Sequence, residues 1–368
     1  MHAFRTAAVA VLVLGIAAAR APVAAQQRAT EHVVLIVTDG LRWQELYRGA
    51  DTALINEEHG HVEDTAALRR DFAAGSPVEN RRALLPFLWD SVARNGQLYG
   101  NRDLGSAAQV TNGLKFSYPG YNEMLTGRAD PRIDKNSYGP NPNVTVFEWL
   151  GHQPGFEGRV AAFGSWDVFV EIFNRKRAGI HVHAAWETPF PDAATPESRL
   201  LNRLYATTTR IWDGMTYDAY MQAVVEEYLA HHQPRVLYLG FGETDEWAHR
   251  GRYDLYLRAA HQVDQFIADL WRALQGMPAY AGKTTFIITT DHGRGNGPEK
   301  WRDHGRDVEG AEYIWVAVLG PDTAPRGERS KAAAVTQAQV AATVAALLSF
   351  DWPAASPGAA GAIADAMR

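Results

Sequence analysis

Five short apolar runs are spaced along the chain, and each of them ends in polar residues. The runs are rich in β-branched side chains, which is typical of strands buried on both faces of a parallel sheet. Helical patterns lie between them, the clearest at Tyr253–Leu274. This alternation predicts an α/β fold, a three-layer αβα sandwich with a largely parallel central sheet. The predicted strands are His32–Thr38, Arg159–Phe163, Arg235–Phe241, Thr284–Thr290 and Tyr313–Leu319.

Acidic and histidine side chains follow several of these predicted strands. In open α/β sheets ligands bind beyond the carboxyl ends of the strands, so these positions are candidates for a site. Each one alone is equally well explained as a helix cap or a surface pair. The chain has no cysteine, so a metal site must use oxygen and nitrogen ligands, a set that suits zinc and is large enough for two ions. The candidate ligands are Asp39, Asp245, His249, Asp291, His292 and His304.

A serine is the candidate nucleophile. Pro119 favours a helix that starts close to Ser117, which puts the hydroxyl at the positive end of the helix dipole. The alternative is a serine that only caps the helix. Two metal ions close together stabilise the attacking and leaving oxygens of phosphoryl transfer, and a nucleophile beside them completes such a site.

The order of these motifs resembles the alkaline phosphatase superfamily, most of all its nucleotide pyrophosphatase/phosphodiesterase branch. The motifs are Asp39-Gly40, Ser117-Tyr118-Pro119 running to Leu125-Thr126-Gly127, Asp245 to His249, Asp291-His292-Gly293 and His304-Gly305. The resemblance implies an alkaline-phosphatase-like fold and a covalent phosphoserine intermediate on Ser117. It also implies two metal sites, one formed by Asp245, His249 and His304, the other by Asp39, Asp291, His292 and the Ser117 oxygen.

The chain departs from these relatives around the serine. The branch usually has Thr in place of Ser117 and an Asn-His pair in place of Gly120-Tyr121, so its fine specificity cannot be transferred. Sulfatases of the same superfamily have Arg where this chain has Tyr121, which counts against a sulfatase.

Three further residues are weaker candidates for substrate contacts. Arg175 and Arg177 could bind the outer oxygens of a phosphate, although a surface patch explains them equally well. Asn136 lies downstream of the nucleophile, as an Asn does in the branch, but with a different spacing.

The N-terminus has the pattern of a secretory signal peptide. Arg5 precedes the apolar run Ala7–Ala19, and small residues at Val23-Ala24-Ala25 offer a cleavage site. Arg20 interrupts the run, which is shorter than the ~20 residues of a membrane span. We therefore expect residues 1–25 to be removed, no membrane span afterwards, and a periplasmic or secreted protein. Residues 26–368 are expected to form one catalytic domain with a cap insertion at about 165–216.

The sequence thus predicts an exported hydrolase of small phosphate esters with two divalent metal ions, for which zinc is favoured. A net charge of −6 gives no indication of a nucleic-acid groove. Monoesters and diesters both remain open, as do the natural substrate, the identity of each metal and the oligomeric state. The alternatives are a phosphomutase-like phosphotransferase, a sulfatase-like hydrolase and a binding protein that keeps its metals for structure.

Overall fold

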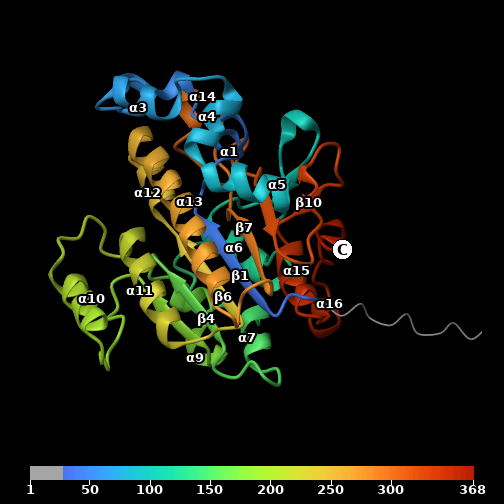
Figure 1. Ribbon diagram of the computed structural model, residues 1–368. Coiled ribbons are helices and arrows are strands. Elements are labelled where there is room, and N and C mark those ends of the chain that lie inside the picture. The colour runs from blue at the N-terminus through green and yellow to red at the C-terminus, as the bar shows by residue number, and fades with distance from the viewer. Residues whose placement is uncertain (1–27) are drawn as a thin grey trace, which may run out of the picture.

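The computed structural model describes residues 28–368, so the predicted signal peptide at residues 1–25 lies outside the described residues. An eight-stranded sheet forms the centre of the molecule, with the strand order β5-β4-β6-β1-β7-β8-β2-β9 (Figure 1). Strands β3 and β10 form a separate two-stranded sheet. The strands are β1 His32–Thr38, β2 Gln97–Tyr99, β3 Ala108–Gln109, β4 Val160–Gly164, β5 His181–Ala184, β6 Val236–Phe241, β7 Thr284–Thr289, β8 Val316–Leu319, β9 Gly327–Glu328 and β10 Val335–Thr336.

Helices cover both faces of the sheet. Val34 and Ile36 of β1 belong to one apolar cluster, with residues of the helices α11 (Asp218–His231) and α13 (Tyr253–Gly276). Val33 and Leu35 point the other way, into a second cluster with residues of the helices α6 (Ser117–Thr126), α7 (Val146–Gly151) and α15 (Gln339–Leu347). Because successive side chains of a strand alternate between its faces, β1 is buried on both sides, and the predicted three-layer αβα sandwich is confirmed.

The helices have the following bounds: α1 Trp43–Arg48, α2 Glu57–Gly60, α3 Thr65–Phe72, α4 Pro77–Leu84, α5 Ala93–Asn95, α6 Ser117–Thr126, α7 Val146–Gly151, α8 Phe169–Ile172, α9 Arg175–Ala178, α10 Pro196–Thr207, α11 Asp218–His231, α12 Glu243–His249, α13 Tyr253–Gly276, α14 Gly297–Lys300, α15 Gln339–Leu347 and α16 Trp352–Ala355. Short 3-10 turns lie at Thr52–Leu54, Arg102–Leu104 and Ala364–Ala366, and a π-helical turn lies at Leu88–Val92.

The sheet is largely parallel, as predicted. Strand β1 pairs in parallel with β6 on one side and with β7 on the other. Strand β8 is antiparallel to both of its neighbours, β7 and β2, so it runs opposite to the other seven strands. It begins at Val316, three residues later than the predicted start at Tyr313. The predicted helix at Tyr253–Leu274 is found as α13, which extends to Gly276.

The range for which a cap was predicted, about 165–216, includes part of the sheet itself. His181–Ala184 forms the edge strand β5, which pairs in parallel with β4. The remainder contains α10, which packs beside α11 at the outer side of the molecule (Figure 1). The extent of a cap and the single-domain boundary remain predictions.

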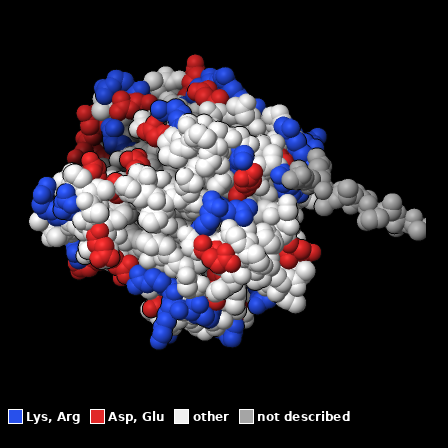
Figure 2. All heavy atoms as spheres, turned by 60° about the horizontal axis from the view of Figure 1, so that its bottom comes forward, with Lys and Arg blue, Asp and Glu red and all other residues white. Residues whose placement is uncertain are grey.

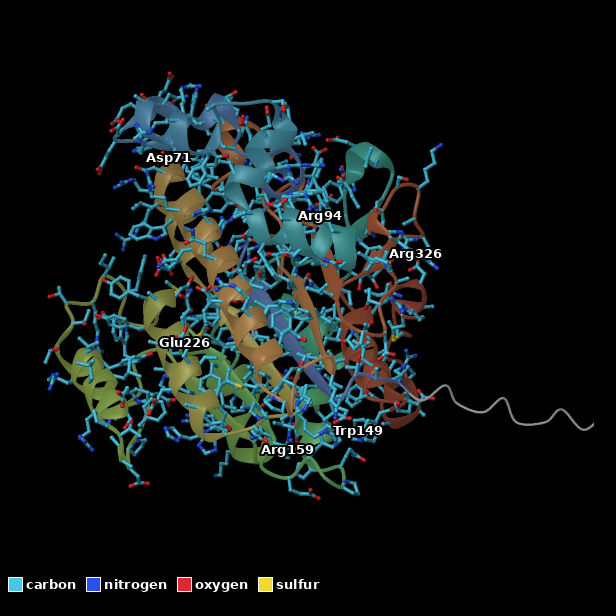
Figure 3. All side chains as sticks on the ribbon, in the orientation of Figure 1. Asp71, Arg94, Trp149, Arg159, Glu226 and Arg326 are labelled. Atoms are coloured by element: carbon cyan, nitrogen blue, oxygen red, sulfur yellow. The ribbon has the colours of Figure 1, made fainter. Side chains whose placement is uncertain are left out.

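The surface carries charges of both signs. Figure 2 shows acidic and basic side chains interspersed on one face of the molecule. Figure 3 shows Arg159, directly before β4, at the bottom of the view, so the carboxyl ends of the parallel strands lie toward the opposite edge. Within residues 28–368, no helix is both long enough and apolar enough to cross a membrane.

Candidate metal centre

The three central strands bring the predicted acids together. Strands β6, β1 and β7 are neighbours, so their carboxyl ends meet at one edge of the sheet. Asp39 directly follows β1, and its N–H donates to the Phe241 carbonyl at the end of β6 over 2.8 Å. Asp291 follows β7 after one residue, and Asp245 lies in the first turn of α12, which begins just beyond β6.

The inner group consists of Asp39, Asp291 and His292, all of them buried. The His292 Nε2 atom lies 3.3 Å from Asp39 Oδ1 and 3.5 Å from Asp291 Oδ2. Its Nδ1 atom is 2.9 Å from the Gly293 carbonyl, which fixes the ring so that Nε2 faces the carboxylates. The other oxygens are held in place, since Asp291 Oδ1 accepts from Gly40 N–H at 3.0 Å and Asp39 Oδ2 accepts from the Tyr121 hydroxyl at 2.9 Å.

The outer group is the predicted second ligand set, Asp245, His249 and His304; the ligand atoms of Asp245 and His304 also lie within 4.8 Å of one another and of His292. Asp245 and His249 are one helical turn apart on α12, with His249 Nε2 3.2 Å from Asp245 Oδ2. His304 Nε2 lies 2.9 Å from His249 Nε2 and 3.6 Å from Asp245 Oδ1. The side chain of His249 is 45% exposed, whereas that of His292 is fully buried. The outer group is therefore the one that opens to solvent.

The inner group fits a metal ion. Asp39 Oδ1, Asp291 Oδ2 and His292 Nε2 are buried atoms without a hydrogen-bond partner, and they converge on one another. Buried polar atoms are almost always paired, so three orphaned ligand atoms facing one point indicate a cation between them. Nitrogen and carboxylate oxygen are the donors that zinc accepts in a protein without cysteine.

The ionisation of these groups shows how closely the charges are packed. Burial raises the pKa of Asp291 to about 8, and the nearby Asp39 carboxylate adds to the shift. For His292 burial lowers the pKa, but Asp291 and Asp39 outweigh this and raise it to about 9. Burial lowers the pKa of His304, with the positive charges of His292 and Arg294 acting in the same direction. Like-charged groups this close together are typical of functional sites.

Helix α6 places the candidate nucleophile. Ser117 is its first residue, as predicted, and the side chain is buried. The helix backbone packs directly on the candidate ligand Asp291, because a Cβ atom added at Gly120 would lie 2.5 Å from the Asp291 carbonyl oxygen. Asn136 accepts a hydrogen bond from the Tyr118 N–H at 3.0 Å, next to the serine. Asn136 thus lies at the site, and its role toward substrate stays a prediction.

A cavity of about 260 Å³ opens over these groups. Its walls contain the predicted residues Asp39, Ser117, Asn136, Asp245 and His249. They also contain Trp166, Met215, Gly242 and Glu246, which the sequence did not single out.

Arg175 and Arg177 do not line this cavity, in contrast to their predicted role. Arg175 pairs with Glu187 over 2.8 Å and also bonds to the Val182 carbonyl. Arg177 forms two bonds to the Glu148 carboxylate, at 2.8 and 2.7 Å. Both guanidinium groups, on α9 from Arg175 to Ala178, bond to other parts of the fold, so the residues that line the cavity give no support to the predicted substrate contact.

The supporting roles of three residues escaped the sequence reasoning. Tyr121 is buried and bonds to Asp39. The fully buried Arg294 donates to Asp245 Oδ1 and to the Gly40 carbonyl, and thereby links the ends of β1, β6 and β7. Asp218 accepts from the N–H groups of Gly242 and Glu243 at 3.0 and 3.1 Å, which holds the turn before Asp245. Each acts on a residue far away in the sequence, so no local pattern marks it.

Comparisons with known proteins give one partial match to a family model. Residues 180–352 match the model of the Metalloenzyme superfamily. A search of curated protein sequences finds no match.

Solved structures share the fold at low sequence identity. The alkaline phosphatase PafA, in a mutant form, has a TM-score of 0.58 and 12% identity, covering 94% of this chain and 100% of that one. The phosphonate monoester hydrolase SpPMH from Silicibacter pomeroyi has a TM-score of 0.52 and 15% identity, covering 91% of this chain and 76% of that one. The 2-O GAG sulfatase BT1596 has a TM-score of 0.53 and 12% identity, covering 92% and 74%. The shared fold and the match over residues 180–352 agree with the predicted resemblance to the alkaline phosphatase superfamily, while a place in its nucleotide pyrophosphatase/phosphodiesterase branch stays a prediction.

Proposed function

We propose that the chain is a two-metal hydrolase of phosphate esters that acts through a covalent phosphoserine on Ser117. One observation carries the proposal: three orphaned buried ligand atoms of the inner group converge at the same strand ends where α6 presents Ser117. The inner group and the Ser117 oxygen would hold one ion, and Asp245, His249 and His304 would hold the other. Bound there, divalent ions would withdraw charge from the attacking and leaving oxygens.

The chain's own residues supply the nucleophile and its position. Ser117 Oγ forms a bond to phosphorus while the bond from phosphorus to the leaving alcohol oxygen breaks. Water then attacks the same phosphorus, the bond to Oγ breaks, and the serine is regenerated. Asn136 uses its Oδ1 to hold the Tyr118 N–H, which leaves its amide NH₂ to donate to a phosphoryl oxygen.

A sulfate ester is the second candidate substrate, because a sulfatase is among the proteins with this fold. Tyr121 favours the phosphate ester. The position that holds Arg in sulfatases is filled here by a buried tyrosine whose hydroxyl donates to Asp39, so no cation stands two residues after Pro119.

The first experiment measures metal content and turnover together. Protein purified without chelators is analysed for zinc, magnesium, manganese and iron. Hydrolysis of p-nitrophenyl phosphate, bis-p-nitrophenyl phosphate and p-nitrophenyl sulfate is followed before and after EDTA. We expect two divalent ions per chain, zinc first among them, and hydrolysis of a phosphate ester that EDTA abolishes and zinc restores. Hydrolysis of the sulfate alone would establish the second candidate, and no turnover with metal bound would refute both.

The serine assignment is tested by two substitutions. Ser117→Ala should retain its metals and lose turnover, whereas Ser117→Thr keeps a hydroxyl and should retain part of it. Mass spectrometry of acid-quenched enzyme should find phosphate on the peptide that contains Ser117. Normal turnover in Ser117→Ala would refute the nucleophile.

We also propose that the enzyme is exported, on the basis of the signal-peptide pattern in residues 1–25. N-terminal sequencing of the protein from the periplasm or the medium should begin at Gln26. Recovery of the uncut chain from the cytoplasm would contradict export.

A further inference from the structure

Strand β5 forms one outer edge of the central sheet. Within residues 28–368 its strand neighbour is β4, and no further strand follows on the other side. The backbone groups along such an edge pair readily with another extended chain, which makes an edge strand a potential site of self-association. The strand at the opposite edge, β9, has only two residues, whereas β5 has four, His181–Ala184. The edge at β5 is therefore the one that most needs protection.

Val182 and Ala184 are the residues of β5 whose backbone groups point away from the sheet. The N–H of Ala185, just after the strand, donates to the Gly164 carbonyl of β4 over 3.0 Å. Because the backbone groups of successive residues in a strand point to opposite sides, those of Val182 and Ala184 face outward. Both residues are buried, so an unpaired backbone group at either position would be costly.

One ion pair binds an outward group of each residue. Arg175 Nη1 donates to the Val182 carbonyl over 3.2 Å, and the Ala184 N–H donates to Glu187 Oε2 over 3.2 Å. The same two side-chain atoms, Nη1 and Oε2, lie 2.8 Å apart. In a parallel sheet one residue of a neighbouring strand would donate its N–H to the first group and accept from the second with its carbonyl. The ion pair thus takes the place of one residue of an additional strand.

The segments on either side of β5 place the two side chains. Arg175 is the first residue of α9, which precedes the strand. Glu187 follows the strand after a turn in which Ala185 has a φ of 47°, a conformation that residues other than glycine rarely adopt. The Glu187 N–H donates to the Ala184 carbonyl over 3.2 Å, so the chain returns to the edge that it has just left. The side chains of Arg175 and Glu187 are 40% and 38% exposed, and they lie between the edge and solvent.

We propose that the Arg175–Glu187 pair caps the edge of β5 and prevents a second copy of this chain from adding its own β5 there. A second copy is the relevant partner because it presents the same outward groups. Antiparallel pairing of β5 with itself about a two-fold axis would satisfy the groups of both copies. The inference does not depend on the proposed function, since neither Arg175 nor Glu187 lines the cavity. It gives Arg175 a role in place of the predicted phosphate contact.

The test separates the backbone contacts from the charge. Glu187→Gln and Glu187→Ala remove the same charge, but only the glutamine keeps an oxygen that accepts from the Ala184 N–H. The double variant Arg175→Glu with Glu187→Arg keeps an ion pair, but it puts a carboxylate against the Val182 carbonyl and a guanidinium against the Ala184 N–H. We expect Glu187→Gln to sediment like the wild type. Glu187→Ala and the double variant should self-associate at least about tenfold more tightly in sedimentation velocity.

The matched control is the ion pair of Arg48 and Asp103, whose side chains are 53% and 47% exposed. It joins the end of α1 to the 3-10 turn at Arg102–Leu104, and neither residue is in a strand. Arg48→Asp with Asp103→Arg should leave self-association unchanged. Hydrogen exchange is the second readout. The Ala184 N–H should exchange faster in dilute Glu187→Ala than in the wild type, and its protection should return at higher concentration as two copies pair.

Two results would overturn the inference. If Glu187→Gln self-associates as tightly as Glu187→Ala, the charge keeps the copies apart and the backbone contacts do not. If Glu187→Ala and the double variant sediment like the wild type, the edge of β5 needs no cap. Circular dichroism shows whether each variant is folded, and if the double variant is not, the comparison of Glu187→Gln with Glu187→Ala decides alone. Turnover is not measured, so a failure of the proposed function leaves this test unaffected.

Discussion

Substitution of Gly120 by alanine tests whether the distance between the nucleophile helix and the metal ligands is set by direct backbone contact. Gly120 lies in the first turn of α6, three residues after Ser117. An alanine Cβ at this position would lie 2.5 Å from the Asp291 carbonyl oxygen, about 0.9 Å short of the 3.4 Å at which ordinary contact begins. The Cβ atom is fixed rigidly to the backbone of α6, and its partner is a backbone carbonyl oxygen. Neither atom can rotate away, so α6 must move.

Two opposing effects determine the stability of the variant. Overpacking of this kind costs ~1–3 kcal/mol. Alanine in place of glycine inside a helix recovers ~0.5–1 kcal/mol. The free energy of unfolding should therefore fall by no more than ~2.5 kcal/mol. Catalysis should suffer much more, because a displacement of ~1 Å between reacting groups costs ~100-fold in rate.

The assay combines urea unfolding with kcat/KM for whichever phosphate ester the wild type hydrolyses best. Gly276→Ala is the matched control, since Gly276 ends α13 and has no atom within 4 Å of the added Cβ. The control should gain ~0.5–1 kcal/mol and keep full activity. If Gly120→Ala stays within about twofold of wild-type kcat/KM, contact with Asp291 does not position Ser117, and the spacing between α6 and the metal ligands must be set by other contacts.

Three further perturbations follow from the same structure. Removal of the metals by EDTA should lower the Tm measured by calorimetry, because a free ion concentration of ~1,000 times the Kd stabilises the folded protein by ~4 kcal/mol. An unchanged Tm would contradict metal binding at the orphaned ligand atoms. Asp218→Ala leaves the Glu243 N–H without its acceptor, while the Gly242 N–H keeps Ser165 Oγ at 3.2 Å, so the free energy of unfolding should fall by ~1–3 kcal/mol in urea, with reduced metal content as a second readout. Burial raises the pKa of Asp264 from 3.8 to about 7, so the folded protein binds this proton more tightly than the unfolded chain, and stability should fall as pH rises between about 4 and about 7. Comparison of urea unfolding at pH 5 and pH 8 should show a smaller loss in Asp264→Asn than in the wild type, and identical losses would refute this assignment.

The central strands could be predicted because their pattern is local. Strand β1 has the predicted bounds, His32–Thr38, since an uninterrupted run of apolar and β-branched residues buried on both faces has few other solutions. The outer strands β2 and β9 have only three and two residues, too few for any periodicity to appear. Their pairing depends on the strands beside them.

The direction of β8 could not be predicted, because a run of apolar residues does not indicate whether a strand is parallel or antiparallel to its neighbours. Four buried residues look the same in a parallel and in an antiparallel strand. A parallel neighbour needs a crossover along one face of the sheet, whereas the segment between β7 and β8 stays at the carboxyl edge and supplies His292 and His304 to the site. Strand β8 must then start at that edge and run back, so its direction follows from the position of the candidate metal ligands.

The same distinction separates the site residues that could be predicted from those that could not. A residue directly after a strand is located by the main chain, so Asp39, Asp291 and His292 could be brought together before any packing was known. The partner of a long side chain is decided by whatever surrounds it in the fold. Arg177 was a predicted phosphate contact, but in the structure its guanidinium bonds to Glu148. Arg294 was not predicted to have a role, but it bonds to Asp245 and Gly40 and so links three strand ends. The convergence of the strand-end acids and His292 was therefore within reach of sequence reasoning, but the partners of long side chains such as Arg177 and Arg294 were not.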